Sequence, residues 1–401
     1  MAAALMLRRD GHVVTVFERF DAPRALGSGL MLQPTGMAVL DTLELGEAVR
    51  AAASRIKRLF GRAAGSGAVV LDVRYTALGA TAGCGFGIHR AALFEVLHRA
   101  VAAAAIPVVT GRTLLSSTQT VAGRSVSFAD GTQADGFDLV VDSLGHGSPL
   151  APPTGRPLAY GALWASLDWP GSAFDGAALE QRYRAASIMA GVLPIGLAPG
   201  SPRPKAALFW SLRTDQLEVW RTRGLEAWKA DFERIWPQTR PLLEQIVEPE
   251  QLTFARYAHR TLKRPFGPAL AHIGDAWHST SPQLGQGANM ALLDAYALAL
   301  ALREEPTDLP SALARYARLR TGHVRLYQTM SALFTPVYQS DGRVLPFLRD
   351  RLVGPLSKAW PVNQLQAGMV SGLIGAPLRP LGLAPTRQAR AAPVPAATTS
   401  L

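Results

Sequence analysis

One segment, residues 270–303, restricts the fold of this 401-residue chain more than any other. It predicts a short strand ending in Gly274-Asp275, a glycine-containing loop over 282–289 and a long apolar helix over 290–303. The strand end places a carboxylate beside the loop. The loop leads into a helix N-terminus, which presents N–H donors and the positive end of the helix dipole. The segment therefore predicts an α/β fold that holds a flat, anionic group at this turn.

The first eighteen residues predict a second part of a dinucleotide-binding fold. Residues 2–9 are strong helix formers, Gly11 follows as a stop, and a buried strand is predicted over 13–17, ending in Glu18. An acidic residue at the end of the second strand binds ribose in such folds. The fold also needs a first strand and a Gly-rich turn, which we expect immediately upstream of Met1 in a full-length relative. Without them we expect weak cofactor binding. An ordinary helix–strand pair is the alternative.

The pattern changes after residue 150. Aromatic and β-branched runs separated by Gly and Pro, among them 188–197, indicate an antiparallel sheet inserted between two parts of the first domain. The predicted organisation is a first domain over 1–150 and 263–330, a substrate domain over 151–262, a C-terminal helical region over 331–384 and a disordered tail over 385–401.

Charge and cysteine content limit the partners. Lys plus Arg is 41 and Asp plus Glu is 30, giving a net charge of +11. This charge indicates either an anionic partner or only an Arg-rich genome. No basic run points to nucleic acid, and no apolar run reaches the roughly 18 residues that span a bilayer. Cys84 is the only cysteine, which excludes an intrachain disulfide and a cysteine-rich zinc site. We expect no metal and a cytoplasmic location.

Together these motifs resemble the class A flavin-dependent monooxygenases, the p-hydroxybenzoate hydroxylase-like family, from residue 2 to about 320. The resemblance implies a Rossmann-like FAD-binding domain with an inserted antiparallel-sheet substrate domain. On the matching positions it assigns cofactor contacts to Glu18, Arg19, Arg24, Gly29, Arg90, Leu114, Asp275, Gly287, Ala288 and Asn289.

The resemblance also implies a reaction: hydroxylation of an aromatic or other electron-rich small molecule with NAD(P)H and O₂, through a flavin hydroperoxide. Residues 287–289 would supply the electrostatic element. Three features depart from the family pattern. The Gly-x-Gly-x-x-Gly turn is absent, Leu144 replaces the aspartate of an Asp-Gly motif, and Pro149 and Leu150 follow Ser148 where the family has an arginine. Met31 occupies the place where some relatives carry a histidine base, so the catalytic residues remain unassigned.

Two other functions stay open. The basic charge and an apolar stretch around Met330, Phe334 and Phe347 would suit a membrane-surface quinone or isoprenoid-type flavoprotein, although membrane association is not favoured. The chain could also be a truncated, non-catalytic relative. The substrate, the choice between NADH and NADPH and the oligomeric state are not predicted.

Overall fold

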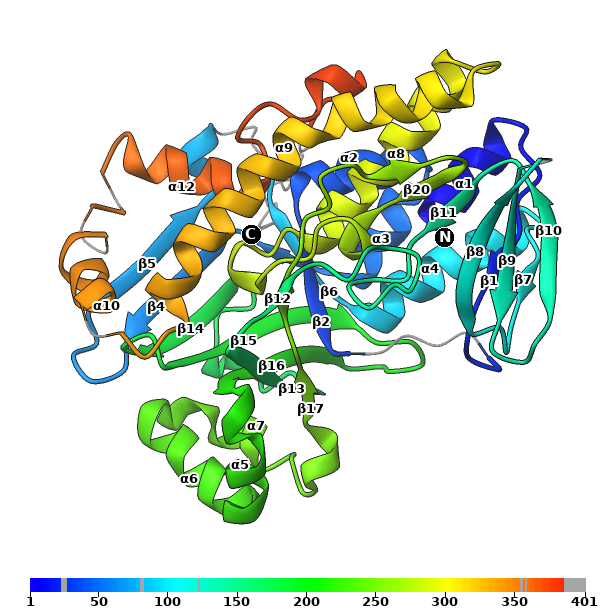
Figure 1. Ribbon diagram of the computed structural model, residues 1–401. Helices are drawn as coiled ribbons and strands as arrows, with labels where there is room; N and C mark the ends of the chain where they lie inside the picture. The colour runs from blue at the N-terminus through cyan, green and yellow to red at the C-terminus, as the bar shows by residue number, and fades with distance from the viewer. Residues whose placement is uncertain are drawn as a thin grey trace, which may run out of the picture.

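A broad sheet and a group of smaller sheets with helices form the two main layers of the structure (Figure 1). The computed structural model describes residues 1–22, 27–79, 83–121, 123–342, 344–353, 356–357 and 359–385. Its helices are α1 (Ala2–Arg9), α2 (Pro34–Thr42), α3 (Gly46–Ala52), α4 (Arg90–Ala103), α5 (Leu217–Arg223), α6 (Leu225–Ile235), α7 (Arg240–Leu243), α8 (Gly287–Glu304), α9 (Leu309–Tyr338), α10 (Val344–Leu348) and α12 (Val362–Ser371).

The broad sheet has seven strands, and all but one of its pairings are antiparallel. The exception is the parallel pair of β14 with β4. In spatial order the strands are β17 (Thr253–Ala255), β13 (Tyr160–Asp168), β16 (Pro204–Arg213), β15 (Ile188–Leu197), β14 (Ala178–Arg184), β4 (Arg58–Ala63) and β5 (Val69–Arg74). Because β4 and β5 come from before residue 75, the sheet extends beyond the inserted segment 151–262. The domain limits remain a prediction.

The two faces of this sheet pack against different parts of the chain. Strand alternation puts Trp210 on one face, in an apolar cluster with Trp228 and Phe232 of α6. Phe209 lies on the opposite face, in a cluster with Met31 of β2 (Gly29–Leu32) and Tyr75. Figure 1 shows α5, α6 and α7 on one side of the sheet, and β2, α8 and α9 on the other.

The second layer contains the Rossmann-like FAD-binding part, so the predicted fold class is confirmed. Helices α1, α2, α4 and α8 share its largest apolar cluster. Its strands are β1 (Val16–Phe17) with β7 (Val108–Val109); β2 with β6 (Gly85–His89) and β3 (Ser54–Ile56); β8 (Leu114–Thr120), β9 (Gly123–Phe128) and β10 (Gln133–Phe137); β11 (Val140–Asp142), β20 (Leu270–His272) and β19 (Phe266–Gly267); and β12 (Arg156–Pro157) with β18 (Ala258–His259).

The predicted strand over 13–17 is wrong in length and burial. Only Val16–Phe17 form β1, in a parallel pair with β7, and Val13 is 93% exposed. The apolar run fails as a full strand because, in the described chain, β7 offers only two residues for pairing. The helix over 2–9 and the strand over 188–197 have the predicted limits.

No helix in the described part of the chain is long and apolar enough to cross a membrane.

Candidate active site

The N-terminus of α8 is open to a ligand. The first intrahelical bond runs from Met290 N–H to the Gln286 carbonyl, at 2.9 Å. In the described structure, the amides of Gly287, Ala288 and Asn289 have no acceptor. No acidic residue or side-chain cap occupies this first turn, and no atom within 4 Å would meet a Cβ at Gly287. Three N–H donors without an acceptor and the positive helix dipole therefore lie at this turn.

Asp275 lies beside this turn. The Gly274–Ala276 turn packs on α8, where a Cβ at Gly274 would come within 3.0 Å of the Ala291 Cβ. Asp275 is exposed, and among the described residues its carboxylate has no hydrogen-bond partner. The structure thus places the Gly274–Ala276 turn, which carries Asp275, against α8, and a joint role of Asp275 and residues 287–289 stays a prediction.

The Asn289 side chain is committed to hydrogen bonds within the protein. It is fully buried; its Oδ1 accepts from Gln33 N–H at 2.7 Å, and its Nδ2 donates to the Met31 and Gly285 carbonyls, each at 3.1 Å. Asn289 therefore joins β2 to the 282–289 loop through backbone groups. The backbone amide of Asn289, rather than its side chain, is available to a cofactor.

A buried charge network supports the Gly274 turn. The Asp294 carboxylate accepts from Gly274 N–H at 2.9 Å, from His278 Nε2 at 2.6 Å and from Arg320 Nε at 2.8 Å. These contacts hold the pKa of Asp294 at about 2, against the cost of complete burial. Sequence reasoning missed this network. A signal was present, because Asp294 is the one acidic residue within the apolar helical run 290–303.

Arg90 borders the loop that precedes β2. Its side chain passes close to Gly27, where a Cβ would come within 2.9 Å of Nη1, and its backbone N–H donates to the Ser28 carbonyl. In the described part of the structure no carboxylate pairs with this exposed arginine. Arg24, the other predicted cation of this loop, lies outside the described residues. Gly29 lies against the broad sheet and lets β2 approach it closely.

Glu18, Arg19 and Leu114 belong to a second group around β1 and β8. The Glu18 carboxylate accepts from Phe20 N–H at 3.0 Å, and its backbone carbonyl accepts from Arg112 N–H at 2.8 Å. This second bond places Glu18 beside the start of β8 at Leu114. Arg19 is exposed and lies over the Phe20 ring. A dinucleotide is extended and contacts a fold at separate points, so two groups of candidates suit it.

Asp142 is the carboxylate that precedes Leu144, the residue that stands in place of the Asp-Gly aspartate. It ends β11, two residues before Leu144, and is buried. Its carboxylate accepts from His272 Nδ1 and Ser148 Oγ, each at 2.7 Å, and from Leu144 N–H at 3.0 Å. This carboxylate is committed to closing the turn and is not directed at a ligand.

The comparisons with known proteins agree with this geometry. The FAD binding domain family matches residues 213–327, from the end of β16 through the 282–289 loop into α9. The chain is 26% identical over 387 residues to aurachin C monooxygenase/isomerase of Stigmatella aurantiaca, covering 89% of this chain and 91% of that protein. It is 27% identical over 365 residues to 3-hydroxybenzoate 6-hydroxylase of Polaromonas naphthalenivorans, covering 85% and 86%. These similarities support the class A FAD-dependent monooxygenases as the family that the chain resembles over most of its length.

A solved structure supports the fold of this monooxygenase. Klebsiella pneumoniae HpxO, complexed with FAD and uric acid, aligns over 93% of this chain and 95% of its own, with a TM-score of 0.78 and 20% identity. The matching family model is an FAD binding domain, so FAD is the cofactor that the comparisons support, and NAD(P)H is the electron donor typical of such proteins. The residues present fit FAD, because the open amides of 287–289 are the donors that an anionic ring requires and Asp275 is free to accept from a ribityl hydroxyl.

Proposed function

We propose that this monooxygenase hydroxylates a neutral, largely apolar aromatic ring, such as a quinolone, rather than a carboxylated ring. The proposed substrate position is the face of the broad sheet that carries Trp164 and Phe209, opposite the 282–289 loop. The two rings lie 4.7 Å apart, centroid to centroid, among Met31, Met189 and Leu193. Such a surface favours a flat apolar ligand.

The charges on this face carry the proposal. Side chains alternate between the two faces of a strand, so in strands β13 to β16 two cations, Lys205 and Arg213, share the face of Phe209. Lys205 Nζ lies 2.5 Å from Asp168, and Arg213 pairs with Asp215 and Asp341. Arg213 is therefore neutralised by two carboxylates, and Lys205 is paired with Asp168, a carboxylate that it shares with Arg203. The carboxylate of a carboxylated substrate would be desolvated here without meeting an unpaired cation that compensates this cost.

The relatives include both substrate types. Besides the aurachin enzyme, a 2-heptyl-3-hydroxy-4(1H)-quinolone synthase of Mycobacteroides abscessus is 25% identical over 369 residues. The hydroxybenzoate hydroxylase represents carboxylated rings. The neutralised cations on this sheet face favour the first type.

The chain's own residues position the reaction. We propose that Glu18, Arg19, Arg24, Gly29, Arg90, Leu114 and Asp275 hold FAD, with the amides of Gly287, Ala288 and Asn289 stabilising negative charge on the ring. When bound, FAD supplies the reduction by NAD(P)H and the activation of O₂. The apolar sheet face excludes water from the substrate position.

Tyr257 is the proposed polar contact for the substrate. Its hydroxyl oxygen accepts from Trp164 Nε1 at 2.9 Å, which leaves its own hydrogen available. Burial raises the pKa of Tyr257 to about 12, so at neutral pH it donates a hydrogen bond and does not act as a base. A ring oxygen of the substrate is the matching acceptor.

The experiment compares a neutral and a carboxylated substrate on the FAD-loaded protein. We expect 2-methyl-4(1H)-quinolone to stimulate NAD(P)H oxidation and to gain one oxygen atom by mass spectrometry, and 3-hydroxybenzoate to do neither. Tyr257→Phe should lower kcat/KM for the quinolone by about tenfold, while Tyr296→Phe, on α8, should leave it unchanged. Hydroxylation of 3-hydroxybenzoate with the higher kcat/KM would overturn the proposal.

A further inference from the structure

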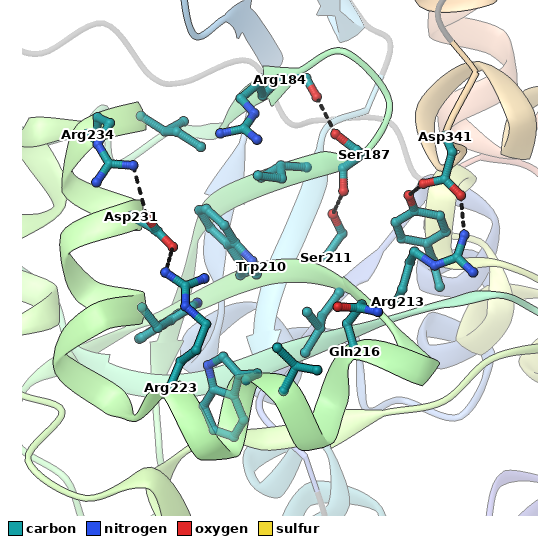
Figure 2. Close-up of a pocket in the computed structure, with 17 residues that line it drawn as sticks. Arg184, Ser187, Trp210, Ser211, Arg213, Gln216, Arg223, Asp231, Arg234 and Asp341 are labelled. Carbon is teal, nitrogen blue, oxygen red and sulfur yellow. Dashed lines mark hydrogen bonds and ion pairs between the residues drawn. The ribbon is translucent and has the colours of Figure 1, made fainter.

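A cavity of about 510 Å³ lies on the other face of the broad sheet, away from the 282–289 loop. Trp210 and Ile188 of the sheet form one wall, and Trp220 of α5 and Trp228 of α6 form the other. Figure 2 shows Trp210 at its centre, with Arg184, Arg223 and Arg234 around it. Neither the cofactor nor the proposed substrate accounts for this cavity.

The cavity offers flat aromatic surface. The Trp210 and Trp228 rings meet edge to face, with centroids 6.3 Å apart and planes at 80°. Leu212 and Ile235 add aliphatic side chains to the lining. Indole and aliphatic walls of this kind bind planar rings through apolar contact.

Two indole N–H groups at the cavity lack acceptors. Trp220 Nε1 and Trp228 Nε1 are both buried and have no hydrogen-bond partner within the described structure, and Trp228 is only 4% exposed. A buried donor without an acceptor costs free energy, and indole can only donate. A ligand that carries acceptor oxygens would satisfy both groups.

The charge of the lining is positive. Four arginines line the cavity, but Arg213 is paired with Asp215 and Asp341, which leaves Arg184, Arg223 and Arg234 against the single acid Asp231. Asp231 pairs with both Arg223, at 2.8 Å, and Arg234, at 2.9 Å. Arg184 has no ion pair in the described part of the chain. The excess of arginine favours an anionic ligand.

We propose that this cavity is a second ligand site, which binds an aromatic carboxylate. The ring lies against Trp210, and the carboxylate accepts from the unpartnered indole N–H groups and from Arg184. The site is separate from the catalytic one, because Phe209 and Trp210 point to opposite faces of β16. The same sheet thus presents a neutral apolar surface to one ligand and a cationic cavity to another.

The experiment titrates the FAD-loaded protein with 2-naphthoate by isothermal titration calorimetry, while the visible flavin spectrum is recorded. We expect saturable binding at one site with no change in the flavin spectrum. The neutral isostere 2-naphthamide should bind at least about tenfold more weakly, because it lacks the charge. Absence of 2-naphthoate binding up to millimolar concentration, or a flavin spectrum that titrates together with the heat, would overturn the proposal. This result does not depend on turnover, so it is independent of the proposed substrate.

Matched variants locate the site. Trp228→Phe keeps an aromatic ring but removes the N–H, and should weaken 2-naphthoate binding about tenfold. Arg184→Gln should weaken it about threefold, since this arginine is exposed. Trp169→Phe and Arg221→Gln change the same residue types outside the lining and should have no effect. Equal affinity in Arg184→Gln and Arg221→Gln would contradict the assignment even if Trp228→Phe fails to fold.

Discussion

At the scale of single residues, Asp294 is the most consequential side chain in the core. It and Arg320 are both fully buried, and Asp294 also binds His278 and the amide of Gly274. The carboxylate therefore compensates a buried guanidinium and positions the turn that carries Asp275. Removing one member of such a pair leaves an uncompensated charge in the interior.

Asp294→Asn preserves the shape of the side chain but removes its charge. We expect the free energy of unfolding to fall by about 3–5 kcal/mol, because Arg320 is left buried without a counter-charge. Urea denaturation measures the change. Asp135→Asn, at an exposed carboxylate, should stay within about 0.5 kcal/mol of the parent. A loss below 1 kcal/mol in Asp294→Asn would show that Arg320 finds another partner.

His323 gives the core a pH dependence. Burial first, and the neighbouring Arg320 second, lower the pKa of His323 from 6.5 to about 3. Arg320 Nη1 lies 3.0 Å from His323 Nδ1, so the neutral ring accepts this bond. Below pH 6.5 His323 is protonated in the unfolded chain, whereas in the folded chain it stays neutral down to about pH 3. The free energy of unfolding should therefore fall by about 1.4 kcal/mol for each unit by which the pH is lowered between 6.5 and 3. This loss adds to the one caused by other titrating groups.

The variant His323→Gln should remove that part of the slope. Urea unfolding at several pH values between 6.5 and 4 measures it, and His12→Gln, at an exposed histidine, serves as the control. Identical slopes in the parent and in His323→Gln would show that His323 is already protonated in the folded protein.

At the scale of elements, the close approach of β2 to the broad sheet sets the position of the 282–289 loop. Asn289 ties the Met31 and Gln33 backbone to α8, and Gly29 at the start of β2 lies against β15. A Cβ at residue 29 would come within 2.4 Å of Ile195 Cγ2 and 3.1 Å of Ala207 Cβ. The register of β2 therefore depends on the absence of a side chain at this position.

Gly29→Ala should destabilise the protein by about 1–3 kcal/mol, since the new methyl group forces β2 away from β15. Thermal unfolding and FAD affinity should change together. Gly29→Ala combined with Ile195→Ala should cost less than the sum of the two single variants, because the truncation removes the clashing Cγ2. Gly65→Ala, where no atom lies within 4 Å of the added Cβ, is the control. Strict additivity would contradict the clash.

At the scale of the whole molecule, the broad sheet separates two apolar cores. Phe232 of α6 is fully buried in the apolar cluster that contains Trp210, and Leu293 of α8 is fully buried in the largest apolar cluster, on the other side of the sheet. Both side chains stabilise the fold, but only the second lies in the element that presents the 287–289 amides. Stability and cofactor binding should therefore respond differently to the two positions.

Phe232→Ala and Leu293→Ala should each lower the free energy of unfolding by several kcal/mol, about 3–5 and 2–5 respectively. We expect the FAD dissociation constant to stay within about twofold for Phe232→Ala and to rise for Leu293→Ala, because only the latter loosens α8. Flavin fluorescence at a temperature where both variants remain folded measures this. Parallel loss of FAD in both variants would show that the two cores act as one.

The amino-acid sequence by itself determined those features that rest on local interactions. The helix Ala2–Arg9, the strand Ile188–Leu197 and the turn that joins Asp275 to the α8 N-terminus follow from helix propensity, strand patterning and loop chemistry within a few residues. The motifs over residues 2–320 also indicated the family that the comparisons support.

The tertiary structure decided what depends on residues far apart in the chain. It joined β4 and β5 to the broad sheet, turned the Asn289 side chain toward the β2 backbone and shortened β1 to the length of its partner. It also placed the cavity between α5, α6 and the sheet. The physical reason is that strand pairing, side-chain hydrogen bonds and cavities are set by neighbours in space, which local patterns do not specify.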